Sequence, residues 1–124
     1  NNIIFAGQDK SILYQTLGQP ISIESYFFEI ENKQGELIKY NGILFYLIDN
    51  RIVSFEITGS QYSFTSHNIK VGDNISKLMS IYPKSYGNRR SSNTIGINIV
   101  DYDNFIIIEF NSSNIINLIA LGSY

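Results

Sequence analysis

The residue types that carry most acid–base, nucleophilic and metal chemistry are scarce in this chain of 124 residues. Cysteine is absent, and the single histidine, His67, lies in a polar stretch before a predicted helix. A Ser-His-acid triad needs an activated serine, and the Gly-x-Ser-x-Gly turn that exposes such a serine is missing. We therefore interpret His67 as a solvated side chain and expect the protein not to be an enzyme.

The acidic residues also lack the spacing of a catalytic pair or a cation site. Asp101 and Asp103 flank a tyrosine in a predicted turn, without the further acidic positions of a calcium loop. Glu24 falls on the opposite face of its predicted strand from Glu29 and Glu31, so all three are interpreted as surface charge. We expect no catalytic residue, no cofactor and no metal ion.

Two glycines and one basic pair are the remaining candidates for a binding site. Gly7 and Gly72 each precede a predicted helix, but a phosphate loop needs further glycines and usually Lys-Ser or Lys-Thr. Backbone freedom at a turn is sufficient to explain both. Arg89 and Arg90 are neighbouring basic residues that either steer an acidic partner or simply keep a loop soluble.

The aromatic residues, 14% of the chain, are the strongest positive signal. Tyr26 and Phe28 share one face of a predicted strand and Phe27 points to the other; Phe45 and Tyr46 are opposed in the same way. Such rings either bind a partner through large, stiff contact areas or pack across strands and stiffen the sheet. The predicted partner-binding residues are Tyr26, Phe28, Tyr40, Tyr46, Tyr62, Arg89, Arg90 and Tyr102.

The composition narrows the functional classes. Eleven acidic and nine basic residues give a net charge of -2, which argues against a nucleic-acid binder. The 44% of apolar residues is enough to bury a core, so disorder is not expected. No apolar run approaches the roughly 20 residues that span a bilayer.

The first part of the chain reads as one helix followed by strands. A helix is expected over 9–17, capped by Asp9 and ended by Gly18 and Pro20. A hairpin turn is expected at 31–36, and two tight turns at 41–42 and 49–50. The predicted strands are 21–30, 37–40, 43–48 and 51–58.

The second part repeats this order after a polar connector over 61–70. Ile75, Leu78, Met79 and Tyr82 fall at i, i+3, i+4 and i+7, which predicts one face of a helix that Pro83 terminates. A loop is expected over 84–93. The predicted strands are 95–100, 105–110 and 114–121.

The two parts align as an internal repeat. Residues 6–9 align with 71–74, and 51–59 align with 114–122, at offsets of 65 and 63. The prediction is an α+β fold with two tandem helix-plus-antiparallel-meander units, 1–60 and 71–124, within one compact domain. Both helices would cover one face of a common sheet, because neither unit can bury a face alone. The residues expected to point inward from the helices are Ile12, Leu13, Leu17, Ile75, Leu78, Met79 and Tyr82.

Residues 69–78, IKVGDNISKL, followed by Tyr82-Pro83, resemble the helix-opening signature of the beta-lactamase-inhibitor-like fold. These residues also resemble the corresponding segment of the small outer-membrane lipoproteins of the beta-barrel assembly machinery. The resemblance implies an exported protein that binds other proteins. The chain lacks the cysteines and tryptophan of the secreted inhibitors, so beta-lactamase inhibition is not carried over.

The combined prediction is an exported, non-enzymatic protein-binding module of the periplasm, cell envelope or secreted fraction. Its only methionine is Met79, and we interpret the start at Asn1 as the result of a removed leader. An inhibitor or immunity-type protein that neutralises a partner protein belongs to this class. The alternatives are an envelope-assembly lipoprotein tethered to a membrane, a small-molecule binder with a pocket between sheet and helices, and a subunit that self-associates through edge strands in 105–110 and 114–121.

Overall fold

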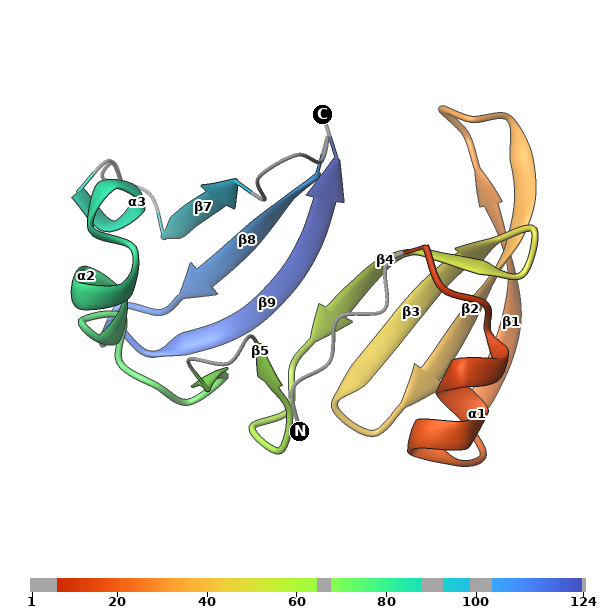
Figure 1. Ribbon diagram of the computed structural model, residues 1–124, viewed down its shortest axis with the longest axis horizontal. Helices are drawn as coiled ribbons and strands as arrows, with labels where there is room; N and C mark the ends of the chain where they lie inside the picture. The colour runs from red at the N-terminus through yellow and green to blue at the C-terminus, as the bar shows by residue number, and fades with distance from the viewer. Residues whose placement is uncertain (1–6, 65–67, 88–92, 99–103, 124) are drawn as a thin grey trace.

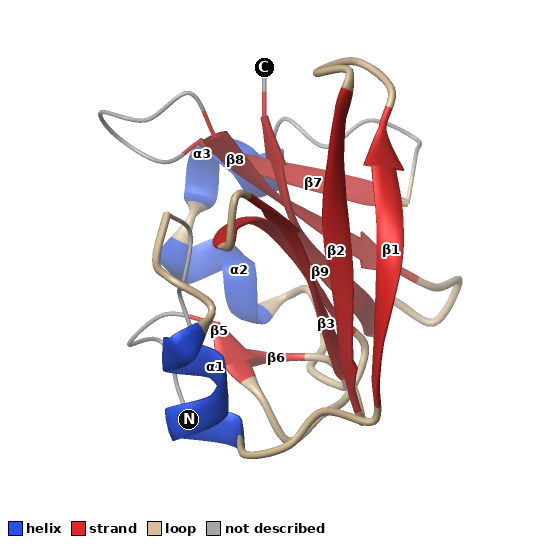
Figure 2. Ribbon diagram, turned by 90° about the vertical axis from the view of Figure 1, so that its right-hand side faces the viewer, coloured by secondary structure: helices blue, strands red, loops and turns tan. Residues whose placement is uncertain are grey.

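The described residues fold around one antiparallel sheet of seven strands, with three short helices (Figure 1). The computed structural model describes residues 7–64, 68–87, 93–98 and 104–123. In spatial order the strands are β1 (Ser22–Phe28), β2 (Lys33–Tyr40), β3 (Ile43–Ile48), β4 (Arg51–Ile57), β9 (Ile116–Ser123), β8 (Asn104–Phe110) and β7 (Thr94–Asn98). The helices are α1 (Ser11–Leu17), α2 (Lys77–Ile81) and α3 (Pro83–Gly87), and they lie on one side of the sheet (Figure 2). The predicted α+β fold is confirmed.

The two halves begin with the same local backbone structure. The N–H of Gly7 donates to the Ile52 carbonyl at 2.7 Å, and that of Gly72 donates to the Ile116 carbonyl at 2.8 Å. Both glycines have positive φ angles, 80° and 101°, which side chains rarely tolerate. Asp9 and Asn74 each accept the backbone N–H two residues on at 2.9 Å, which starts the helical turns of α1 and α2.

The halves also share an irregularity in their central hairpins. The β3–β4 register shifts between Tyr46 and Leu47, and the β8–β9 register shifts between Glu109 and Phe110. A β-bulge bends its strand and increases the local twist, so both halves curve at the same place. The hydrogen bonds of Ile52 and Ile116 place β4 and β9 at an offset of 64, so the predicted offset of 63 is wrong by one residue.

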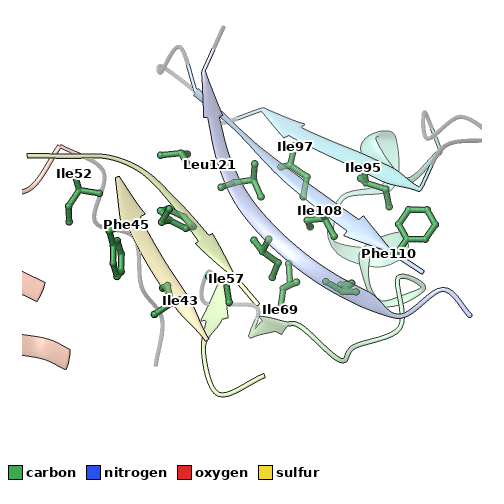
Figure 3. Packing of buried hydrophobic residues seen from close by; sticks show 14 of the residues in the cluster. Ile43, Phe45, Ile52, Ile57, Ile69, Ile95, Ile97, Ile108, Phe110 and Leu121 are labelled. Atoms are coloured by element: carbon green, nitrogen blue, oxygen red, sulfur yellow. The ribbon is translucent and has the colours of Figure 1, made fainter. Parts of the chain in front are cut away.

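The equivalent strands β4 and β9 join the halves at the middle of the sheet. Glu56 pairs with Ala120, its own equivalent 64 residues later, and Ile57 pairs with Ile119, the equivalent of Phe55. A local twofold axis therefore relates the halves. Figure 3 shows buried side chains from both halves in one layer, with Ile57 and Ile69 near the junction.

The core occupies the helix-covered face and repeats position by position. All members of the repeated set are at most 7% exposed. The equivalent pairs, taken from the strand registers and helix starts, are Leu13 and Leu78, Ile38 and Ile95, Ile43 and Ile106, Phe45 and Ile108, Leu47 and Phe110, Ile52 and Ile116, Phe55 and Ile119, and Ile57 and Leu121. Burial of large side chains on one face of a curved sheet is the main stabilising term of the fold.

Several predicted elements are corrected by the structure. The β1–β2 turn is 29–32 rather than 31–36, because Asn32 takes the left-handed conformation (φ 54°) and β2 begins at once with Lys33. The predicted loop over 84–93 begins instead with α3, because Pro83 starts a new helix as well as ending the old one. The connector contains the two-stranded sheet β5 (Ser63–Phe64) and β6 (Ile69–Lys70), and Ile69 is fully buried.

The predicted inward face of the second helix is wrong at one position. Met79 is 53% exposed, whereas Ile75 and Leu78 are buried. The helical spacing fails because α2 begins only at Lys77, so Ile75 reaches the core from the preceding turn. The other residues expected to face inward, Ile12, Leu13, Leu17 and Tyr82, are buried or packed against the core.

Candidate functional site

Three aromatic rings meet on the face of the sheet that the helices leave open. We call Tyr26, Phe28 and Tyr46 the ring cluster. The ring centroids of Tyr26 and Phe28 are 4.9 Å apart, those of Tyr26 and Tyr46 5.2 Å, and those of Phe28 and Tyr46 6.3 Å. All three pairs are edge-to-face, an arrangement that aromatic quadrupoles favour. The sequence analysis placed Tyr26 and Phe28 on one face of their strand and named Tyr46 among the binding residues, and the structure brings the three rings together.

Strand alternation and register explain this meeting. Tyr26 and Phe28 are two residues apart on β1, and the neighbouring core-side residue, Phe27, points the other way. Tyr46 lies on β3 beside the buried Phe45 and pairs with Leu37 of the intervening strand β2. The cluster therefore reaches across β2, which carries no aromatic residue at the point of crossing.

Gly35 of β2 makes this crossing possible. It pairs with Tyr26 in the β1–β2 register. A Cβ atom added to Gly35 would lie 2.5 Å from Cε2 of Phe28 and closer still to the carbonyl oxygen of Leu47. The Phe28 ring therefore covers the glycine, as aromatic side chains do when they shield a glycine on a neighbouring strand. The sequence prediction placed this glycine in a turn and so missed its function in the site.

A carboxylate adjoins the ring cluster on the same face. The Tyr46 hydroxyl donates to Oε2 of Glu56 at 3.0 Å, and both side chains are partly buried. Burial, followed by this hydrogen bond to a carboxylate, raises the pKa of Tyr46 to about 12. The hydrogen bond fixes the tyrosine ring and leaves Glu56 able to accept from a ligand. The sequence alone could not place Glu56 here, because its position depends on the β3–β4 bulge.

The β1–β2 hairpin extends the apolar surface beyond the cluster. A hollow of about 640 Å³ is lined by the end of β1 and its turn, from Tyr26 to Glu31. Phe27 is 49% exposed and Ile30 97% exposed. Large apolar side chains on an exposed tip are characteristic of contact surfaces for another molecule.

Two further predicted binding residues, Tyr40 and Tyr62, do not join the cluster. Tyr40 lies on the core side, where its hydroxyl donates to the Gly18 carbonyl at 2.9 Å and its ring packs edge-to-face on Phe45. Burial raises the pKa of Tyr40, with smaller contributions from two other tyrosines. Tyr62 packs against the core beside the short second sheet. The predicted residues Arg89, Arg90 and Tyr102 lie outside the described residues.

The described candidates for acid–base chemistry, Glu24, Glu29 and Glu31, do not form one site. Glu24 forms an ion pair with Lys39 across strands at 3.1 Å. Glu29 and Glu31 lie in the hairpin turn rather than on a strand face, so the alternation argument does not apply to them. Within the described ranges, no group of three or more acidic or histidine side chains could hold a metal ion. His67, Asp101 and Asp103 are outside those ranges.

Comparisons with known proteins support the fold without assigning a family. No protein-family model matches the chain, and no curated protein matches it. Two solved structures are similar. One is an extracellular protein containing a SCP domain from Bacillus anthracis str. Ames, with a TM-score of 0.58 and 12% identity over 99% of this chain and 46% of that chain. The other is the uncharacterized protein yfeY from Escherichia coli, with a TM-score of 0.56 and 11% identity over 93% of this chain and 88% of that chain.

The two similar structures support the fold of this chain and no narrower class of protein. The chain spans a little under half the length of the extracellular Bacillus protein, and that protein's extracellular location is a property of the neighbour. At identities of 11% and 12%, the similarity concerns the helix-and-meander architecture and does not extend to site residues. In the described part of the chain, none of the helices is long and apolar enough to cross a membrane.

Proposed function

We propose that this chain is an exported, non-enzymatic protein-binding module that binds its partner on the open sheet face around the ring cluster. The observation that carries the proposal is the meeting of Tyr26, Phe28 and Tyr46 in mutual edge-to-face contact on a face that none of the described helices covers. Rings held against one another lose little further conformational entropy on binding, and aromatic anchors of this kind dominate interface energetics.

The polar surroundings of the cluster fit a protein partner. Glu56 fixes the Tyr46 hydroxyl at 3.0 Å, and Glu24 with Lys39 forms a polar border on the same face. An apolar centre with a polar rim is the usual anatomy of a protein–protein interface. The proposal includes an inhibitor or immunity-type role, in which the module would cover a functional surface of its partner with this open face.

The small-molecule alternative is less well supported. A pocket between sheet and helices needs convergent polar groups among its apolar walls. Among the side chains that the structure describes, Ser63 is the only buried polar one, and the remaining buried set is aliphatic or phenylalanine. The extracellular location of one structural neighbour supports export of this chain as well.

The proposal is tested by affinity capture from envelope and secreted fractions of the source organism, followed by calorimetry with the purified partner. The variant is the double substitution Tyr26→Ala and Tyr46→Ala. We expect a protein that the native chain retains and that the variant binds at least roughly 30-fold more weakly, because central aromatic anchors contribute about 2 kcal/mol or more.

The matched control is Met79→Ala, which removes another large exposed side chain (53% exposed) from the other half of the molecule. This control should bind the partner as the native chain does. Equal binding by the double variant would refute the ring cluster as the interface. Retention of a metabolite in place of any protein would favour the small-molecule alternative.

A further inference from the structure

β1 ends the large sheet, and its outer edge is unpaired in the described part of the chain (Figure 2). Seven residues, Ser22–Phe28, pair with β2 in continuous register. The strand contains no proline, no lysine and no bulge, which are the usual devices that stop an edge from pairing with another chain. A regular, open edge of this length is a template for a further strand.

The core-side face of this edge is apolar and uncovered. Ile21 is 73% exposed, Ile23 50% and Phe27 49%. The opposite edge of the sheet differs, because Ile95 and Ile97 of β7 are 1% and 5% exposed. The core-side residues of one edge strand are therefore covered, and those of the other are exposed.

We propose that β1 pairs antiparallel with β1 of a second copy of this chain, around a twofold axis through Ser25 perpendicular to the sheet. In this register Ile23 faces Phe27 of the other copy on the core side, twice over. Glu24 faces Tyr26 of the other copy on the open side, and the exposed Ser25 faces itself. The uncovered aliphatic and aromatic side chains thus cover each other across a cross-strand pair.

The neighbouring registers are excluded by charge and side-chain chemistry. An axis through Glu24 places two carboxylates directly opposite each other, and like charges in that position are destabilising. An axis through Tyr26 places Ile23 opposite Glu29 of the turn, so both Ile23–Phe27 pairs are lost. Registers shifted by one residue set the core face of one copy against the open face of the other. The axis through Ser25 pairs all seven residues of β1 and sets Ile23 against Phe27 twice.

The charge of the edge also permits two identical copies to meet. Glu24 is the only charged residue of β1, and Lys39 of the same chain neutralises it at 3.1 Å. The pairing would join two seven-stranded sheets into one, with both ring clusters on the same face. The second copy is an occupant beyond the proposed function. It pairs with the backbone edge of β1 and covers its core-side residues, whereas the proposed partner binds the open face, although Tyr26 and Phe28 belong to the same strand.

Sedimentation equilibrium of the full chain at about 100 µM tests the pairing, since micromolar complexes form at that concentration. We expect twice the chain mass of 14.1 kDa for the native protein. Ser25→Lys places two ammonium groups opposite each other at the axis and should weaken the dimer at least about tenfold. Ser112→Lys adds the same charge at an exposed turn and should leave the dimer intact.

Cross-linking provides a readout that does not depend on affinity. The chain has no cysteine, so Ser25→Cys introduces a single thiol. Residues facing each other in antiparallel strands have Cβ atoms close enough for a disulfide after a small adjustment. We expect mild oxidation to link the Ser25→Cys variant into covalent dimers and to leave the Ser112→Cys control monomeric on a denaturing gel.

A native monomer at about 100 µM would overturn the proposal. A dimer that Ser25→Lys does not weaken, or a Ser25→Cys variant that fails to cross-link, would overturn it as well. These results are separable from the proposed function, because Ser25→Lys leaves all three rings of the cluster in place. A monomeric variant that still binds the partner protein would show that the two surfaces act independently.

Discussion

The two halves of the molecule have the same core and different surfaces. The half formed by α1 and β1–β4 and the half formed by α2, α3 and β7–β9 share a positive-φ glycine, a helical turn and a bulged hairpin. They diverge between the helix and the next equivalent strand. Leu13 and Ile38 are 25 positions apart, whereas Leu78 and Ile95 are 17 apart. The first half has eight more residues there, and this segment contains β1 and its turn.

The difference separates what holds the fold from what is available for binding. Positions that repeat are buried in both halves, so the repeat encodes the core. The segment without an equivalent strand in the described residues carries Tyr26, Phe28 and the exposed apolar tip. Each prediction below therefore changes one half and uses the other as its control.

The largest effect is expected in the shared core. Leu13→Ala and Leu78→Ala truncate two fully buried side chains at equivalent positions. Each should lower the free energy of unfolding by about 2–5 kcal/mol, from lost burial and a residual cavity. Because β4 and β9 pair at the junction, both variants should unfold in one cooperative transition. Urea titrations followed by circular dichroism and tyrosine fluorescence would measure this.

Separate unfolding of the two halves would contradict a common core. In that case each variant would shift one of two transitions and leave the other unchanged. A single transition shifted by either substitution would establish that the repeated positions stabilise one common core.

An intermediate effect is expected at two strand glycines. Gly35→Ala in β2 forces a methyl group against the Phe28 ring and the Leu47 carbonyl, and should cost about 2 kcal/mol. Gly96→Ala in β7 meets no atom within 4 Å and should be neutral or stabilise by about 0.5 kcal/mol. Thermal unfolding of the two variants tests the difference. Equal effects would mean that Phe28 does not cover Gly35.

The sequence predicted the sheet well because strand alternation is a local property. The opposed orientations of Tyr26 and Phe27, and of Phe45 and Tyr46, follow from the two-residue period and are confirmed. The meeting of rings from β1 and β3 depends on pairing across β2, which no local pattern specifies. Gly35 was accordingly assigned to a turn, although it lies inside a strand.

Positions of the repeat were harder to predict than its existence. The one-residue error in the β9 alignment arose because Ile115 and Ile116 are identical in type, and only the hydrogen bond from Gly72 distinguishes them. The edge prediction was wrong for a different reason. The charge-poor runs 105–110 and 114–121 were candidates for edge pairing, but β8 and β9 lie inside the sheet with partners on both sides. An edge is a property of topology, and composition does not reveal it.

The smallest effect concerns Tyr46, whose equivalent at the second bulge is Glu109. Its pKa is raised from 10.0 to about 12, so the folded state binds the phenolic proton more tightly than the unfolded chain does. The associated stability is complete below pH 10 and is lost as the pH rises through 12.

Tyr46→Phe removes the hydrogen bond to Glu56 and should cost about 1 kcal/mol at neutral pH. The variant should also lose the most alkaline phase of phenolate absorbance and a part of the decline in stability between pH 10 and 12. Glu109→Gln, at the matching site of the other half, should leave that phase unchanged. A phenolate titration identical in Tyr46→Phe and the native chain would show that the carboxylate does not hold the tyrosine, and would remove the polar anchor that distinguishes the open face of the first half.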